Sequence, residues 1–136
     1  MIEYLRLIID SGLFVLIVIV QIIIYPSFVY YERENLLKWH KIYTKKIALI
    51  VLPLMLSQLT ISLIQVYLVA TITSITYVLL VLFLWIVTLL KFAPMHTEIS
   101  KGNFNRKFLN KLIYLNWMRT TAWFILLILS AEKFIF

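Results

Sequence analysis

Cysteine is absent from the 136 residues, and the chain has only two glycines and three prolines. Without cysteine there can be no disulfide, thiolate metal site, iron–sulfur cluster or cysteine nucleophile. Charged residues are also scarce, at 14% of the chain, whereas about a quarter is typical of a soluble domain. Hydrophobic residues make up 63% of the chain. This composition suits lipid better than water, and it predicts an integral membrane protein with a single transmembrane domain over residues 1–136.

Uncharged runs set the number of membrane spans. Ser11 to Tyr31 is one such run, long enough for a single helix across the hydrocarbon. Ile47 to Leu90 is about twice that length and must form a hairpin, with its turn expected between Val66 and Ser74. We expect spans at residues 8–31, 42–67, 75–93 and 109–131. The predicted fold is an all-α, up-down antiparallel four-helix transmembrane bundle.

The three prolines mark expected breaks in these helices. Pro26 should kink or end the first span, and Pro53 should kink the second. Pro94 disfavours helix at the residue before it, so the third span should end there. The charged segment from Glu32 to Lys46 is expected to connect the first two spans.

The polar residues of the first span share one stripe at helical spacing, which should face the bundle. The stripe consists of Asp10, Phe14, Ile17, Gln21, Tyr25, Phe28 and Glu32. Asp10 lies near the outer end of the span, where we expect an interfacial position.

Basic residues are distributed unevenly between the two sides of the predicted membrane. Those near the first loop are Arg33, Lys38, Lys41, Lys45 and Lys46, and those near the third are Lys91, Lys101, Arg106, Lys107 and Lys111. The opposite side holds only Arg6 and Lys133. The positive-inside rule therefore predicts a multi-pass cell-membrane protein with both termini outside and the charged loops in the cytoplasm. The net charge of +7 fits this topology beside anionic lipid, and we expect no nucleic-acid partner.

The last span carries Asn116 and Arg119 within an apolar run. A charge at the centre of a membrane helix costs roughly 2.5–3.5 kcal/mol on insertion scales. No carboxylate lies at the depth of Arg119 in any span. Its counter-charge must come from Glu32 or Glu98 at the rim, from lipid phosphate reached by snorkelling, or from a ligand.

Polar groups from all four spans converge on the half of the membrane nearer the charged loops. Tyr25, His40 and His96 are the candidate catalytic residues. The candidate substrate-binding residues are Gln21, Glu98, Asn116, Arg119 and Trp123.

Several chemistries suit this set. One histidine could act as a general base while Arg119 and Asn116 hold an oxyanion, in an enzyme acting on a lipophilic substrate. His40 and His96 could instead be axial ligands of haem iron in a redox protein, or could bind a divalent metal with Glu32 or Glu98. A third alternative is a non-catalytic membrane subunit or assembly factor, in which the polar groups hold the helices together. The residues do not specify a cofactor.

Short motifs resemble those of small four-span membrane proteins of the anthrone-oxygenase-like group. The motifs are Tyr25-Pro26-Ser27-Phe28, Trp39-His40 with Tyr43, Pro94-Met95-His96, and Asn116-Trp117 with Arg119-Thr120. The resemblance implies a cofactor-independent or metal-assisted oxidation of an aromatic, lipophilic substrate. The expected partners are thus membrane lipid and a lipophilic small molecule, with a homo-oligomer as an open alternative.

Overall fold

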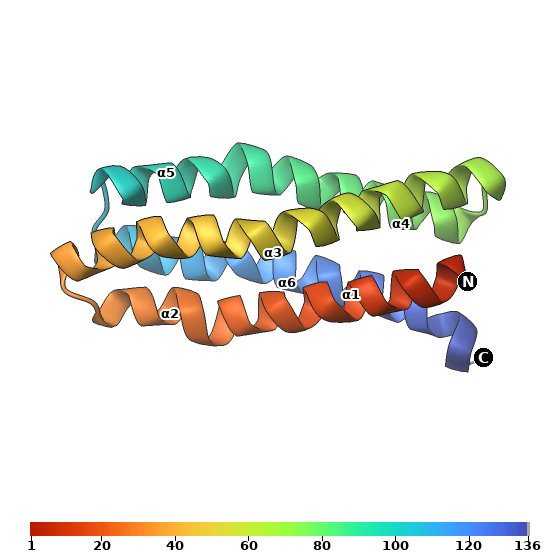
Figure 1. Cartoon of the computed structure of the whole chain (residues 1–136), viewed down its shortest axis with the longest axis horizontal. Coiled ribbons are helices and arrows are strands. Elements are labelled where there is room, and N and C mark those ends of the chain that lie inside the picture. The colour runs from red at the N-terminus through yellow and green to blue at the C-terminus, as the bar shows by residue number, and fades with distance from the viewer. Residues whose placement is uncertain (136) are drawn as a thin grey trace.

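The computed structural model describes residues 1–135 as four long helical rods packed antiparallel (Figure 1). Each rod is long and apolar enough to cross a membrane. The rods span Ile2–Tyr30, Arg33–Leu68, Ile72–Lys101 and Arg106–Ile135. The predicted four-span helical bundle is therefore confirmed.

Two of the rods are interrupted by short segments of different helical geometry. The first rod consists of α1 (Ile2–Ile19), the π-helical η1 (Val20–Ile24), α2 (Tyr25–Ser27) and the 3₁₀ turn η2 (Phe28–Tyr30). The second rod is α3 (Arg33–Leu68). The third consists of α4 (Ile72–Val87), the π-helical η3 (Thr88–Phe92) and α5 (Ala93–Lys101), and the fourth is α6 (Arg106–Ile135).

The connections between rods are short. The α3–α4 turn lies within the predicted region, and Thr71 and Ser74 form a reciprocal cap at the start of α4, each side chain accepting the other's backbone N–H. Gly102 ends α5 with a φ of 84°, a left-handed conformation that glycine adopts without strain. Both termini and the α3–α4 turn lie at one end, here called the terminal end (Figure 1). The other two connections lie at the opposite end, called the loop end.

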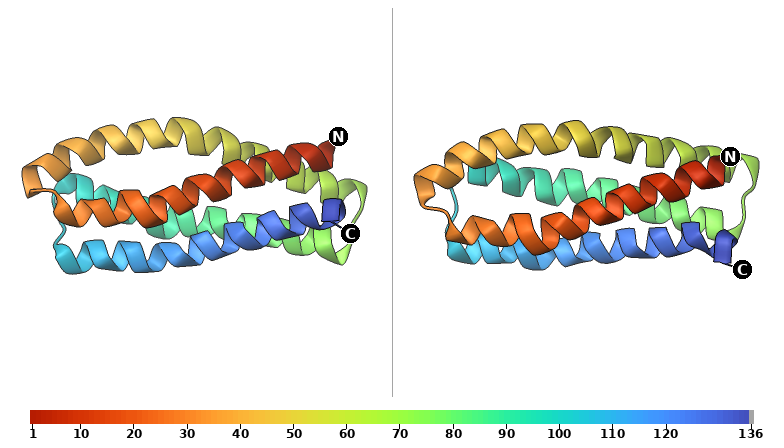
Figure 2. Two further views of the ribbon diagram at one scale, coloured as in Figure 1. Left: turned by 90° about the horizontal axis from the view of Figure 1, so that it is seen from below. Right: turned by 60° about the horizontal axis from the view of Figure 1, so that its bottom comes forward.

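The expectation that Pro94 ends the third helix is wrong. The chain continues as α5, and the π turn η3 immediately precedes the proline. The π turn η1 likewise precedes Pro26 in the first rod. Proline cannot donate the N–H that an α-helix requires, and a π turn changes the local bonding so that the rod can pass through it. Pro53 lies within the uninterrupted α3, which is visibly bowed (Figure 2).

The helices extend beyond the predicted membrane spans, because the charged segments are also helical. Glu32 to Lys46 is not a loop, since α3 begins at Arg33. Lysine and glutamate favour helix, so a helix can continue past the membrane edge. His40 is therefore more than a turn inside a helix, and its side chain is completely buried.

The four rods form a ring in the terminal half of the molecule. There α1 packs on α3 and α6, and α4 also packs on α3 and α6. Toward the loop end the packing changes: α2 lies against α6, and α5 lies against α3. Figure 2 shows α3 bowing away from the first rod in this region. Side chains bridge the two helix pairs where the backbones separate, and this is where the candidate site lies.

The stripe predicted on the first rod does face the bundle, except for the exposed Glu32. The expected interfacial position of Asp10 is wrong, because its side chain is fully buried inside the bundle. Its carboxylate accepts hydrogen bonds from Gln58 at 2.6 Å, from Tyr77 at 2.8 Å to each oxygen, and from Ser130. These donors come from α3, α4 and α6, so one carboxylate joins all four rods.

Arg6 lies one turn from Asp10 and is also buried. Its guanidinium donates to the Gln65 side chain at 2.8 Å and to the Leu129 carbonyl at 3.0 Å, and it lies over the Tyr77 ring at 4.6 Å. Tyr77 therefore contacts both the cation and the anion. We call Arg6, Asp10, Gln58, Gln65, Tyr77 and Ser130 the terminal polar cluster.

Candidate functional site

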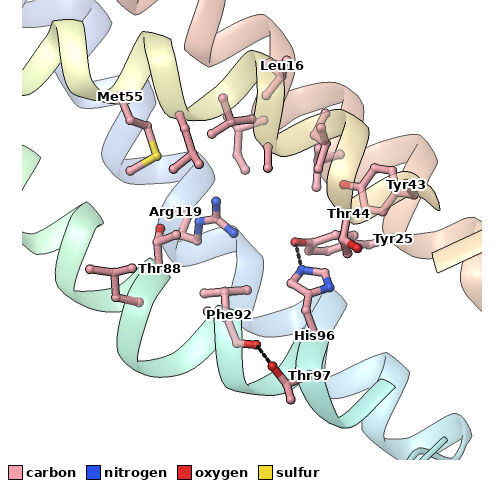
Figure 3. Close-up of a pocket in the computed structure, with 18 of the residues that line it drawn as sticks. Leu16, Tyr25, Tyr43, Thr44, Met55, Thr88, Phe92, His96, Thr97 and Arg119 are labelled. Atoms are coloured by element: carbon pink, nitrogen blue, oxygen red, sulfur yellow. Dashed lines mark hydrogen bonds between the residues drawn. The ribbon is translucent and has the colours of Figure 1, made fainter. Parts of the chain in front are cut away.

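A cavity of about 430 Å³ lies between the rods in the loop half of the bundle. Side chains from all four rods line it, and several are drawn in Figure 3. Most of them are apolar; the polar ones are Tyr25, Tyr43, Thr44, Thr88, His96, Thr97, Ser100, Arg119 and Trp123. A mostly apolar cavity of this size with a few polar groups is typical of a small-molecule site.

The cavity reaches the outer surface of the bundle between the second and third rods. Leu52 of α3 and Leu89 of η3 line it, and both are exposed on the face that would meet lipid. Ala93 and Thr97 continue this exposed edge toward the loop end. A hydrophobic molecule could therefore enter sideways from the membrane.

A chain of four hydrogen-bonded side chains begins at the cavity wall. The Tyr25 hydroxyl lies 2.8 Å from His96 Nε2, the bond drawn in Figure 3. His96 Nδ1 lies 2.8 Å from His40 Nε2, and His40 Nδ1 lies 3.0 Å from Ser100 Oγ. We call this series the Tyr25–Ser100 relay. It joins α2, α3 and α5 across the gap between the two helix pairs.

The relay can carry its hydrogens in either of two directions. In one, Tyr25 donates to His96, His96 donates to His40, and His40 donates to Ser100. In the other, every donor becomes an acceptor, because a neutral imidazole has one N–H and one free nitrogen. Passing one proton in at Tyr25 and one out at Ser100 converts the first arrangement into the second. Such a series can move a proton along the cavity wall from Tyr25 to Ser100, which lines the same cavity nearer the loop end.

Local helix geometry explains how these residues meet. His96 and Ser100 are four residues apart on α5 and so share one face. Tyr25 follows the π turn η1, and His96 lies four residues beyond the π turn η3. π turns occur frequently at functional sites. The first and third rods therefore each have a π turn beside the cavity.

Arg119 is buried, with 7% of its surface exposed, and it lines the cavity. Figure 3 shows it projecting from α6 into the space bounded by Met55, Thr88 and Phe92. Its guanidinium carbon lies 4.4 Å from the centre of the Phe92 ring and 5.3 Å from that of Trp123. The side chain thus stays in the protein interior and does not snorkel to the membrane surface.

Gln21 and Asn116 do not line the cavity, although both are buried behind it. Asn116 Nδ2 donates to Gln21 Oε1 at 3.0 Å, and the Thr120 hydroxyl donates to the same oxygen at 3.2 Å. Gln21 Nε2 donates to the Ile113 carbonyl at 3.1 Å. This network links the first rod to α6, and Asn116 Oδ1 also accepts from Arg119 at 3.4 Å.

The two glutamates proposed at the rim lie away from the cavity. Glu98 accepts from Asn103 at 3.0 Å and from Lys101 at 3.3 Å on the exposed side of α5. Glu32 is exposed at the start of α3. Neither lines the cavity, so neither supplies a counter-charge to Arg119 there. Their positions along the chain predict the end of the bundle at which they lie, but not that their side chains face away from the cavity.

The two histidines do not fit the expected haem ligation. Their facing nitrogens are 2.8 Å apart and share a hydrogen bond. Iron held between two axial imidazoles, with bonds of about 2 Å as in other metal–histidine sites, needs about 4 Å between those nitrogens. A divalent-metal site lacks ligands too, because residues 1–135 contain no group of three histidine, aspartate or glutamate side chains close enough to hold an ion.

Several residues that line the cavity are not predicted as site residues from the sequence. Ser100 shares a face with His96, and that four-residue spacing would have identified it if the helix had been expected to continue past Pro94. Phe92 and Thr88 belong to the π turn η3, which no feature of the sequence predicts. Met55 of α3 resembles any other apolar residue of its span.

No family model, curated protein or solved structure matches this chain. The chain is a small membrane protein with four candidate spans. What its site does must therefore be inferred from the cavity and from the side chains around it.

Proposed function

We propose that this protein binds a lipophilic, aromatic molecule taken from the membrane and removes a proton from it. The observation that carries this proposal is the Tyr25–Ser100 relay, which begins at the wall of an apolar cavity. The relay also joins α2, α3 and α5, but apolar contacts could join them equally well, and only a hydrogen-bonded series can carry a proton along the wall. The protein would then be a membrane-embedded enzyme using general-base catalysis.

Proton transfer would begin at the Tyr25 hydroxyl. A C–H group of the ligand that is acidified by a conjugated carbonyl, as in anthrone, or the hydroxyl of its enol form, gives its proton to the Tyr25 oxygen as Tyr25 passes its own proton to His96 Nε2. His96 Nδ1 then passes a proton to His40, His40 Nδ1 passes one to Ser100, and Ser100 releases its own hydroxyl proton to solvent at the loop end. The ligand is left as an oxyanion in a site closed to bulk water, where nearby positive charge stabilises it strongly.

The resemblance to the anthrone-oxygenase-like group suggests the next step. An electron-rich aromatic anion is a suitable substrate for oxidation, and dioxygen would be the oxidant in an oxygenase-like reaction. The residues around the cavity favour the cofactor-independent form of this chemistry, because they do not fit haem or a dedicated metal site. The activity would therefore be that of an oxidoreductase acting on an aromatic lipophile.

Substitutions in the relay test this proposal. In lipid nanodiscs under nitrogen, the wild-type protein should accelerate formation of the coloured anion of anthrone. Tyr25→Phe and His96→Ala should each slow this step by about 100-fold, the usual contribution of a positioned acid or base. Stopped-flow absorbance measures the rate.

Tyr30→Phe is the matched control, because Tyr30 is 90% exposed and lies outside the cavity. It should retain the wild-type rate. Equal rates in wild type, Tyr25→Phe and His96→Ala, with anthrone still bound, would refute the catalytic proposal in favour of a non-catalytic membrane subunit.

We also propose that the loop end faces the cytoplasm, with both termini outside. The basic residues gather at the loop end, as the positive-inside rule requires of cytoplasmic loops. The cavity would then lie in the inner leaflet. The absence of cysteine allows a direct test with single substitutions at two exposed positions, Val69→Cys and Lys107→Cys.

A membrane-impermeant maleimide should label Val69→Cys on intact cells, and Lys107→Cys only after permeabilisation. The unsubstituted protein is the blank. The opposite labelling pattern would reverse the orientation.

A further inference from the structure

We propose that the ligand binds as an anion, with its negatively charged oxygen on Arg119. This inference rests on the proposed function, since it concerns the occupant of the same cavity. The proposed function leaves the charge of the bound ligand open; this inference assigns a negative charge and names Arg119 as the residue that recognises it.

Arg119 has no counter-charge within residues 1–135. The two ion pairs described there join Lys101 to Glu98 and Lys133 to Glu3, at the two ends of the bundle. No aspartate or glutamate lines the cavity. A buried cation without a partner is strongly unfavourable in a membrane, so the charge is retained for a ligand that neutralises it.

The guanidinium also has spare hydrogen-bonding capacity. Arginine carries five N–H donors, yet Arg119 makes one described hydrogen bond, to Asn116 Oδ1 at 3.4 Å, and the Tyr25 hydroxyl is the other protein oxygen that interacts with it. Arg119 Nε is buried without a partner, and so is the hydroxyl of Thr88, which lines the same cavity. Buried polar atoms are nearly always satisfied. An oxyanion could accept from both side chains.

The aromatic neighbours hold the cation at the cavity and cannot neutralise it. Phe92 and Trp123 present their rings to the guanidinium carbon at 4.4 and 5.3 Å. Such contacts attract a cation through the ring quadrupole and leave its full charge in place. They also restrict the side chain, so the donors are already oriented before a ligand arrives.

The chemistry recognised is an anionic oxygen on a lipophilic body. Two sources share it: the carboxylate of a long-chain fatty acid, and the phenolate or enolate of an aromatic compound. An arginine fork suits both, because it can donate two N–H groups to one anion. The two sources are distinguished by pairing each with its own neutral analogue.

The test measures binding in detergent through quenching of tryptophan fluorescence. The probe pairs are palmitate with hexadecanol, and dinitronaphthol, which is ionised at neutral pH, with its methyl ether. The wild-type protein should bind the anion of at least one pair about tenfold more tightly than its neutral analogue, as expected for a charge-assisted contact. The pair that shows this preference identifies the source.

Arg119→Gln should abolish the preference, and Arg119→Lys should largely retain it. Arg106→Gln is the matched control, since Arg106 is an exposed arginine at the start of the same helix. It should bind like wild type. A measurement on wild type alone provides a second check: the preference for palmitate should disappear at a pH low enough to protonate the free acid.

The outcomes separate the two proposals. If neutral and anionic probes bind wild type equally, or if the preference survives Arg119→Gln, the anion inference is overturned while lipophile binding stands. If no probe binds, the cavity is not a lipophile site and both proposals fail.

Discussion

The Asp10→Leu variant should lose about 3–5 kcal/mol of folding stability, the range seen when one partner is removed from a buried charged network. Asp10 accepts from Gln58, Tyr77 and Ser130 in a site without solvent exposure. Leucine would leave all three donors unpaired, and Arg6 would lose its nearby anion. Because these groups come from all four rods, the packing of the entire terminal half should weaken.

Thermal unfolding in detergent, followed by circular dichroism, measures this loss. Glu3→Gln is the control, because Glu3 lies on the same helix and its ion pair with Lys133 is exposed. Its unfolding temperature should remain at the wild-type value. Tyr77→Phe should give a smaller loss than Asp10→Leu, and the double variant should lose less than the sum, since both substitutions remove the same bonds. Wild-type stability in Asp10→Leu would show that the terminal polar cluster does not hold the rods together.

Arg119→Leu should have the opposite effect and stabilise the ligand-free protein. Replacing a buried charge with a well-packed apolar residue is often neutral or stabilising by about 1–4 kcal/mol. The substitution removes only one long hydrogen bond, at 3.4 Å, together with two ring contacts. A gain in stability on removing a conspicuous polar residue indicates a residue retained for function and not for folding.

Asn116→Leu provides the comparison for this second result. Asn116 lies one turn away on α6, and its amide donates to Gln21 at 3.0 Å. That variant should be less stable than wild type, because the Gln21 and Arg119 side chains lose a partner. The same thermal measurement applies to both variants. If Arg119→Leu proves as unstable as Asn116→Leu, Arg119 is part of the structural network and its proposed role in binding is wrong.

The fold follows from hydrophobic length and helical spacing, which are local properties of the chain. The run from Ile47 to Leu90 is too long for one span, and its turn occurs where predicted, near Thr71. The stripe from Asp10 to Phe28 faces the bundle because polar groups avoid lipid. Such features can be predicted since each depends on residues close together in sequence.

The site was predicted less completely because it depends on irregular helices and on the rotation of each rod. Pro94 suggested a helix end, and that mistake separated His96 from Ser100. The position of Asp10 near a span end predicts an interfacial side chain, whereas its hydrogen-bond donors come from three other rods. The sequence predicts Glu98 near the loop end, but no sequence signal indicates that it lies on the exposed side, paired with Asn103.

The two π turns have a consequence for tolerance to deletion. Relative to an α-helix, a π turn contains one additional residue, which rotates the following segment by about 100° about the rod axis. The directions of Tyr25 and His96 therefore depend on the residue count in η1 and η3, which precede them. A single-residue deletion in either segment could preserve the rod and its apolar surface while turning half of the relay away from the cavity. The length of these two segments thus matters to the site independently of which apolar side chains they carry.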